Sequence, residues 1–560
     1  MSISLKLSSF KKNNYASWQA ISLAIAALVF FPIATLVVLS ISSGSTGSEL
    51  GSEPRVWSHL FETVLSDYIT GSLTLMLGVA ILTLILGIGS AWLVTQYRFS
   101  GVRFFNWALL LPLAMPTYIT AYSYTGLLDV AGPIQSGIRS YFELDFGNYW
   151  FPEIRSMSGA IFVMSFVLYP YVYLLARASF LDQSQHLRDA AQLLGYSRRM
   201  VFFKVSLPIA RPAIIAGLSL ALMETLADYG AVSYFGVSTF TTGIFRTWYG
   251  LDSVQGAAQL ALVLLMFVII LLSLEKHSRK RSHYDDKNRG HNTPPKSLSG
   301  VKNVIAFSLA ITPLLLGFVI PVAQLLIWAF EKYEQLFDAS FWGLVVNTLS
   351  LASITAFIAL SLALIAAYAH RIINNRVTGF SNGLIKLGYA IPGTVIAVGT
   401  LIPLARLDNQ VDAWFRNHFD FSTGLLISGT IAALIIAYLV RFLAVALKTI
   451  DSGLTNIPNN MDQAARSLGS TPTTIMRRIH IPMLRTSLLT ALLLVFVDVM
   501  KELPATLIMR PFNFNTLAVR AYELASDERL ADASLASIAI VLVGLVPVIL
   551  LTKQISKTKS

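Results

Sequence analysis

Cysteine is absent from the 560-residue sequence, and charged residues are scarce. Without cysteine the chain can form no disulfide bond, thiolate metal site or cysteine nucleophile. Only 13% of the residues are charged whereas 55% are hydrophobic, and the mean hydropathy is +0.63. This composition is too apolar for a soluble globular protein. We therefore expect membrane lipid to surround most of the chain.

Sequence signatures of two other classes are also missing, and a third feature, the positive charge, has a different explanation. No Gly-rich Walker loop followed by Lys and Ser or Thr is present, so the chain lacks that means of binding ATP phosphates. No constellation of His, Cys or Ser with a plausible base indicates an enzyme. The formal net charge of +12 would suggest nucleic acid in a soluble protein. Here the basic residues lie in alternate loops, as the positive-inside rule predicts for a membrane protein, and no nucleic-acid partner is expected.

Long apolar runs separated by short polar segments predict about twelve transmembrane helices. A bilayer core about 30 Å thick needs roughly 20 apolar residues per helix. The first run, from Trp18 to Ile41, is too long for the core of a signal peptide and is interpreted as a retained helix. The chain is thus predicted to be an all-α polytopic membrane protein with spans near residues 18–42, 69–96, 105–127, 157–180, 206–232, 255–274, 302–328, 345–369, 384–405, 424–448, 482–501 and 533–552.

Loop charges predict the orientation of these helices. Acidic or mixed loops alternate with basic ones, and the positive-inside rule places the basic loops in the cytoplasm. Both termini are then cytoplasmic. The basic residues that define this side are Arg98, Arg103, Arg188, Arg198, Arg199, Lys204, Arg371, Arg376, Lys386, Lys553, Lys557 and Lys559.

Histidine is missing from the middle of every predicted span. An imidazole site for a transition metal inside the membrane is therefore not expected, and no metal site is assigned. Each histidine is interpreted as a solvated residue of a loop, of the linker or of a helix end: His59, His186, His277, His283, His291, His370, His418 and His480.

An internal repeat divides the chain into two halves. Pro392 in the second half corresponds to Pro116 in the first half at an offset of 276 residues, and Gly469 corresponds to Gly195 at an offset of 274. The stretch between the halves is basic and contains Gly290, a composition that cannot bury a core. We expect a first half at residues 1–274, a cytoplasmic basic linker at 275–301 and a second half at 302–560. Each half holds an even number of spans, so the repeats are predicted to be parallel, with a pathway between them.

Each half carries the same loop motif on the cytoplasmic side after its fourth span, near residues 183–205 and 457–480. These two segments are called the first and second docking loops. Paired alanines permit close approach of a partner, the glycine can take the positive φ that ends a short helix, and the proline can begin the next helix. The glycine and the proline are thirteen positions apart in both copies. A motif that occurs twice with the same spacing favours a docking element over a chance occurrence. The residues are Asp189, Ala190, Ala191, Gly195 and Pro208 in one copy and Gln463, Ala464, Ala465, Gly469 and Pro482 in the other.

This doubled motif resembles the integral-membrane permeases of bacterial ABC importers, in the type that fuses two halves. In that family a Glu-Ala-Ala loop with a downstream Gly forms the coupling helix that sits in a cleft of the ATPase. Asp189 and Gln463 depart from the first position of that pattern. The resemblance implies two separate ABC ATPase subunits that bind the ATP and Mg, a periplasmic solute-binding protein as a further partner, and a location in the bacterial cytoplasmic (inner) membrane. It implies no cofactor in this chain and no enzymatic activity of its own.

Two pairs of acidic residues occupy matching positions in the fifth and eleventh predicted spans. They are spaced i, i+4, so the members of a pair share one helix face. Acids within a span are costly and commonly mark a pathway or gate. A structural pairing, with Lys501 as a neighbouring cation, or a position at the wet outer end of the helix are the alternatives. The candidate pathway or gate residues are Glu224, Asp228, Asp498 and Glu502.

Residues 224–230, 501–506 and 510–512 resemble the ferric-iron branch of the permease family. This resemblance implies ferric iron as the cargo, moved by alternating access. A permease for thiamine or another small solute, such as a polyamine or phosphonate, is the alternative within the family. A gradient-driven secondary transporter with twelve helices is the alternative from another class, against which the doubled docking loop argues.

Overall fold

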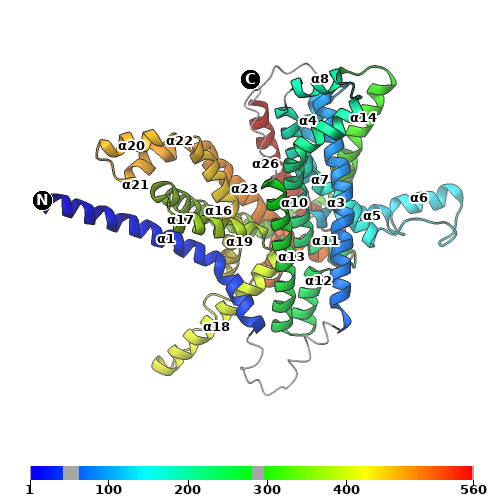
Figure 1. The fold of residues 1–560 in the computed structure, drawn as a ribbon. Coiled ribbons are helices and arrows are strands. Elements are labelled where there is room, and N and C mark those ends of the chain that lie inside the picture. The colour runs from blue at the N-terminus through cyan, green and yellow to red at the C-terminus, as the bar shows by residue number, and fades with distance from the viewer. Residues whose placement is uncertain (1, 42–61, 184, 281–295, 558–560) are drawn as a thin grey trace. The chain divides into compact units, whose positions relative to one another are not determined.

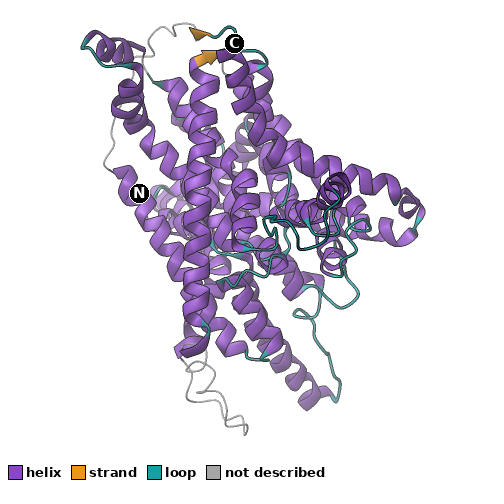
Figure 2. Ribbon diagram, turned by 90° about the vertical axis from the view of Figure 1, so that its right-hand side faces the viewer, coloured by secondary structure: helices purple, strands orange, loops and turns teal. Residues whose placement is uncertain are grey.

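The structure, a computed structural model, describes residues 2–41, 62–183, 185–280 and 296–557 (Figure 1). Helices dominate this part of the chain, and the strands are a parallel pair of two residues each (Figure 2). The central part of the predicted linker, residues 281–295, lies outside the described residues, as do His59, His283 and His291. Residues 275–280 of the predicted linker are helical and form the end of α13.

The first part of the chain, up to Lys280, contains most of the elements of the first repeat. They are α1 (Ser2–Ile41), α3 (Leu65–Gln96), β1 (Tyr97–Arg98), α4 (Val102–Ala108), η1 (Leu111–Ala114), α5 (Thr117–Leu128), α6 (Pro133–Phe142), α7 (Met157–Asp182), α8 (Gln185–Leu193), α9 (Arg198–Val201), η2 (Phe202–Ser206), α10 (Leu207–Ala227), α11 (Gly230–Tyr234), α12 (Phe240–Phe245), η3 (Arg246–Gly250) and α13 (Val254–Lys280).

The second part begins with a strand that pairs with β1. Its elements are β2 (Lys296–Ser297), α14 (Val301–Leu314), η4 (Leu315–Val319), α15 (Ile320–Glu331), η5 (Tyr333–Phe337), α16 (Ala339–Ile373), α17 (Arg376–Leu387), η6 (Gly388–Ala390), α18 (Gly393–Phe419), α19 (Ile431–Thr455), α20 (Asn459–Ser467), α21 (Pro472–Ile475), η7 (Met476–His480), α22 (Ile481–Met483), α23 (Arg485–Lys501), α24 (Pro504–Met509), α25 (Leu517–Ser526) and α26 (Ser534–Lys557).

Eight helices in the described part of the chain are long and apolar enough to cross a membrane, and the number rises to eleven if each of three bent pairs is counted as one span. Helix α26 adds a shorter apolar stretch, Ser534–Leu550. Every one of the twelve predicted spans therefore has a helical counterpart. The predicted fold class, an all-α polytopic membrane protein, is confirmed.

The third span of each repeat is broken, which corrects the continuous helices predicted over 105–127 and 384–405. The chain bends by 93° before α5 and by 114° before α18. The breaks fall at the repeat-related prolines Pro116 and Pro392, and the preceding residues Met115 and Ile391 are extended, with ψ of 125° in both. Proline lacks the N–H of a continuing helix and drives the residue before it out of the α region. An apolar run cannot reveal this break.

The described chain clusters into two compact units, and each contains helices from both sequence halves. One unit comprises 1–58, 244–262 and 338–519, and within it α1 packs against α16, α17 and α18. The other unit comprises 59–243, 263–337 and 520–560, and within it α15 packs against α5 and α26. The first helix of each half thus packs in a unit built mainly from the other half.

Small residues bring the helices of each unit close together. In α3, a Cβ on Gly87 would lie 2.6 Å from Cβ of Val172 in α7, so the two helices could not approach as they do with a larger residue. In the other unit, α16 packs against α19 and α23, and a row of its alanines is buried: Ala352, Ala356, Ala359, Ala363, Ala366 and Ala367. Close packing through small residues is typical of membrane helices, where lipid supplies no hydrophobic driving force between them.

Candidate functional site

Each docking loop contains a short helix that ends in the same way. Gly195 has a φ of 85° and Gly469 a φ of 80°, a left-handed conformation that favours glycine. The backbone N–H that follows each glycine donates to the carbonyl oxygen of the second alanine of the motif, Tyr196 to Ala191 at 3.1 Å and Ser470 to Ala465 at 3.0 Å. This is a Schellman ending, which explains the fixed spacing between alanine and glycine.

The two motif alanines face opposite ways. Ala191 and Ala465 are buried, whereas Ala190 and Ala464 are exposed, together with Asp189 and Gln463. The tips of both loops also expose apolar side chains: Leu193 is 89% exposed and Leu468 is 87% exposed. Exposed apolar side chains of this size mark a surface suited to a protein partner.

A second short helix follows each glycine and runs into the membrane span. Ser197 and Thr471 cap α9 and α21 through their side-chain oxygens. A π-helical turn, η2 or η7, then precedes the dipeptide that contains Pro208 or Pro482. Because proline has no N–H to donate, a wider turn at this point keeps the helix continuous through the proline. In the first repeat the helix continues to the end of the span, over Arg198–Ala227. In the second repeat a bend of 79° follows the proline, between α22 and α23.

The interpretation of His480 as a solvated residue is wrong. Its side chain is fully buried at the end of η7, and Nε2 lies 2.7 Å from Oδ1 of Asp462. His370 is half-buried, with Nδ1 3.0 Å from Oγ1 of Thr378. Position in a polar segment of the sequence predicted solvent exposure, but a buried carboxylate gives His480 a partner inside the protein.

The candidate gate residue Asp228 lies just after α10 rather than within it, which corrects the predicted span 206–232. One carboxylate oxygen accepts from the backbone N–H of Ala231 at 3.0 Å and of Val232 at 3.2 Å, at the start of α11. The other accepts from the hydroxyl of Thr117. Asp228 therefore caps the short helix after the fifth span and joins it to the break in the third span.

Glu502 has the same position in the second repeat and a different partner. It follows α23, accepts from the backbone N–H of Ala505 at 3.2 Å and of Thr506 at 3.3 Å, and caps α24. Its Oε1 also accepts from Nη1 of Arg441 in α19 at 3.0 Å, and Glu502 is only 5% exposed. The charge partner that the structure gives Glu502 is thus Arg441, which no sequence motif singled out.

Repeat symmetry relates the surroundings of the two acids. Gly393 corresponds to Thr117, since each directly follows the proline of the broken third span. A Cβ on Gly393 would lie 2.9 Å from Nη1 of Arg441 and closer still to Oε1 of Glu502. The absence of a side chain at Gly393 thus leaves room for the ion pair of Glu502 and Arg441.

The remaining two acids stay within their helices. Glu224 lies in α10 and Asp498 in α23, one turn before the capping acid, and both are half-buried. The predicted i, i+4 pairs are therefore mixed pairs, with one acid on the helix and one at its end. Among the residues that the structure describes, no three His, Cys, Asp or Glu side chains cluster in a way that could hold a metal ion.

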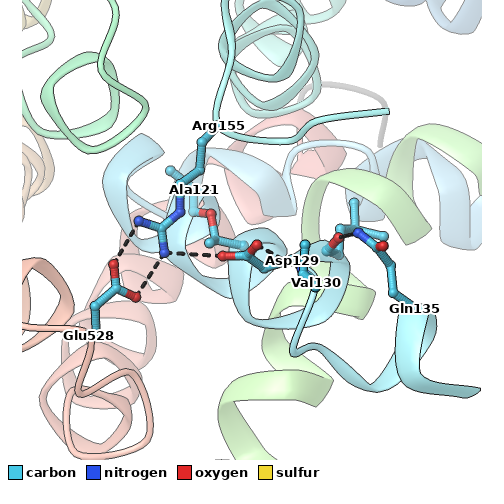
Figure 3. Close-up of polar contacts among 8 residues, drawn as sticks. Ala121, Asp129, Val130, Gln135, Arg155 and Glu528 are labelled. Carbon is cyan, nitrogen blue, oxygen red and sulfur yellow. Dashed lines mark hydrogen bonds and ion pairs between the residues drawn. The ribbon is translucent and has the colours of Figure 1, made fainter. Parts of the chain in front are cut away.

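A further polar cluster was not expected from the sequence. Arg155, in the loop before α7, forms two hydrogen bonds with Glu528 at 2.6 and 2.8 Å and an ion pair with Asp129 at 3.2 Å (Figure 3). The hydrogen bonds from Arg155 lower the pKa of Glu528. Arg155 and Glu528 lie 373 positions apart in the sequence, so no local pattern could have predicted their contact.

Comparison with known proteins gives the family. Residues 83–282 and 359–559 each match the family described as "Binding-protein-dependent transport system inner membrane component". The chain is 27% identical over 503 residues to the Fe(3+)-transport system permease protein FbpB 2 of Haemophilus influenzae, covering 89% of this chain and 92% of that protein. It is 22% identical over 508 residues to the ferric transport system permease protein FbpB of Actinobacillus pleuropneumoniae, covering 86% and 70%.

A shorter match extends the similarity to a different named cargo. The chain is 30% identical over 206 residues to the molybdenum transport system permease protein ModB of Haemophilus influenzae, covering 36% of this chain and 87% of that protein. All of these relatives are transport permeases, and the two family matches together cover most of the chain. This rules out the gradient-driven secondary transporter and an enzyme. The chain therefore belongs to the family of binding-protein-dependent transport system inner membrane components, as a fused two-domain ABC importer permease that works with a periplasmic binding protein and an ATPase.

Proposed function

We propose that this permease carries ferric iron into the cytoplasm by alternating access. The observation that carries the proposal is the extent of similarity: permeases named for ferric transport match along nearly the whole chain, through both halves. The molybdenum permease matches about a third of the chain. Transport of thiamine, a polyamine or a phosphonate is the competing proposal.

Reconstituted transport tests this cargo. The permease, its ATPase and its binding protein would be assembled in proteoliposomes, and uptake of radioactive ferric iron would be measured with ATP and with a non-hydrolysable analogue. We expect ATP-dependent uptake that excess thiamine, polyamine, phosphonate or molybdate does not reduce. Failure of the binding protein to bind ferric ion, or uptake of one of the competitors instead, would overturn the iron assignment.

The two docking loops are proposed to hold two ATPase subunits, which bind the ATP and Mg. Matching helix endings, exposed first alanines and apolar tips in both loops support this role. The positions concerned are Asp189, Ala190, Ala191, Gly195 and Pro208, and Gln463, Ala464, Ala465, Gly469 and Pro482. This arrangement requires both loops, and hence both termini, to face the cytoplasm.

The four acids are proposed to act at a gate, with two different tasks. Asp228 joins the end of the fifth span of the first repeat to the break in the third span, through Thr117. Glu502 joins the end of the fifth span of the second repeat to α19, through Arg441. Glu224 and Asp498, one turn earlier and half-buried, are proposed to face the pathway. A gate needs helices that can change direction without unfolding, and capped breaks supply such points.

A further inference from the structure

The last turn of α16 holds the second docking loop through Arg371. Its Nε donates to Oδ2 of Asp462 in α20 at 2.8 Å. Its two Nη atoms donate to the carbonyl oxygens of Leu454 at 2.6 Å and Ile457 at 2.9 Å. Because the guanidinium is a rigid planar fork of donors, this one side chain ties the end of α19, the following turn and α20 to α16.

His480 binds the other carboxylate oxygen of Asp462 and is buried. Its Nδ1 has no hydrogen-bond partner among the described residues. A protonated ring would place an unsatisfied N–H there, so the geometry fits the neutral ring that donates from Nε2. Burial raises the pKa of Asp462, but the interactions with Arg371 and His480 together outweigh this effect and lower the pKa below its ordinary value. The carboxylate is therefore charged, and both of its oxygens are occupied.

Tyr368 adds a third contact from the same turn of α16. Its hydroxyl donates to the carbonyl oxygen of Pro472 at 2.7 Å, and its ring meets the ring of His480 edge-on at 5.3 Å. Asp462, Pro472 and His480 lie at the beginning, middle and end of the second docking loop. All three are thus attached to one helical turn of α16. We call the four side chains that make these contacts the α16 clamp: Tyr368 and Arg371 of α16, and Asp462 and His480 of the second docking loop.

At the equivalent positions the first repeat has neither the arginine–carboxylate pair nor the histidine of this clamp. Trp92 and Thr95 replace Tyr368 and Arg371, and Arg188 and Ser206 replace Asp462 and His480. The hydroxyl of Thr95 donates within its own helix. Arg188 in α8 donates to the side-chain oxygen of Gln96, a neutral group. The four equivalent positions of the first repeat therefore offer no carboxylate that could form this ion pair.

We propose that Arg371, Asp462 and His480 are positioning residues that make the second docking loop move as one body with α16, so that the ATPase drives the membrane helices chiefly through the second repeat. This inference rests on the proposed docking of the ATPase on these loops. The buried carboxylate, bonded through both oxygens, makes the attachment stiff, whereas no acidic residue stands at the equivalent positions of the first repeat.

Transport and ATP hydrolysis measured in the same proteoliposomes test the clamp. The complex of permease, ATPase and binding protein would carry D462N, with D462E as the conservative variant and R188Q as the matched change in the first repeat. We expect D462N to lower the ratio of transported cargo to hydrolysed ATP about tenfold, a size typical of coupling between two sites. R188Q should change the ratio less than about twofold, and D462E should restore most of it.

Copurification of the ATPase separates the two levels of the proposal. If the wild-type permease does not retain the ATPase, the docking role itself fails. If D462N retains the ATPase and keeps the wild-type ratio, or if R188Q lowers the ratio as much, the clamp is overturned. Should D462N fail to accumulate, H480A keeps the ion pair of Asp462 with Arg371 and still removes one attachment. A lowered ratio in H480A would then support the clamp, and an unchanged ratio would contradict it.

Discussion

Glu502 and Arg441 form an ion pair that is almost withdrawn from solvent, and a glycine leaves the space for it. Breaking a buried pair by removing one partner is costly, because the other charge is left without compensation. Asp228, at the same position of the other repeat, is held by a hydroxyl and two backbone N–H groups instead. Glu502 and Asp228 occupy equivalent positions in the two repeats, but their removal should therefore change the free energy of unfolding by different amounts.

Gly393→Ala is expected to destabilise the protein by about 1–3 kcal/mol, the usual cost of overpacking. The new methyl group would collide with the ion pair of Glu502 and Arg441. Thermal unfolding in detergent measures the effect. Gly383→Ala is the matched control, because no atom lies within 4 Å of its Cβ position. Equal unfolding temperatures for the two variants would contradict the packing argument.

Asp228→Asn combined with Glu502→Gln is expected to impair uptake while leaving ATPase docking intact. Of the single variants, Glu502→Gln should destabilise more, up to about 3–5 kcal/mol, since it strands the charge of Arg441. Asp228→Asn keeps an acceptor for the N–H groups of α11 and should cost about 1 kcal/mol. Uptake assays, copurification of the ATPase and thermal unfolding provide the three readouts. Wild-type uptake by the double variant would remove the case for a gate.

The contact of Glu528 with Arg155 predicts a pH dependence. The pKa of Glu528 is lower in the folded protein than its ordinary value, so its contribution to stability is present above about pH 4.3, the ordinary pKa of glutamate, and is lost as the pH falls through the folded-state pKa. We expect Glu528→Gln to unfold at a lower temperature than wild type at pH 7. The two unfolding temperatures should converge in acid, and a difference independent of pH would argue against the ion pair.

At the scale of elements, each docking loop is a helix ending, a glycine and a capped second helix, and the two alanines differ in their environment. The exposed first alanine is available to a partner, whereas the buried second alanine belongs to the fold. A bulky substitution of the first alanine should therefore affect partner binding, whereas one of the second alanine should affect stability.

Ala464→Trp is expected to fold normally and to weaken ATPase binding at least about tenfold, or about 1.4 kcal/mol, because the indole would occupy the contact surface. Ala465→Trp should instead reduce the thermal stability, since this side chain is buried. Copurification of the ATPase and thermal unfolding distinguish the two outcomes. If Ala464→Trp binds the ATPase as tightly as wild type, that face of α20 is not the docking surface.

At the scale of the whole molecule, the sequence halves and the compact units differ. Helix α1 packs against α16, α17 and α18 of the second half, and α15 packs against α5 of the first half. Neither half can then cover its own apolar faces. The repeat gives the order of elements along the chain, but the long-range contacts decide which elements share a core.

Coexpression of the two halves as separate chains tests this organisation. A chain of residues 1–280 and a chain of residues 296–560 should associate. Each should accumulate poorly when expressed alone, because both compact units need helices from both halves. Copurification through a tag on one chain and the membrane level of each chain are the measurements. Independent accumulation of a stable, monodisperse second half would contradict the mixed units.

The sequence by itself determined the fold class, the doubled loop motif, the positive φ at Gly195 and Gly469 and the paired positions of the acids. These depend on hydropathy, residue spacing and local backbone preference, which act over a few neighbouring residues. The tertiary structure alone decided the partners of the acids, the burial of His480 and the helices that form each unit. Arg441 reaches Glu502 across 61 positions and Arg371 reaches Asp462 across 91, and such pairings depend on how distant helices pack.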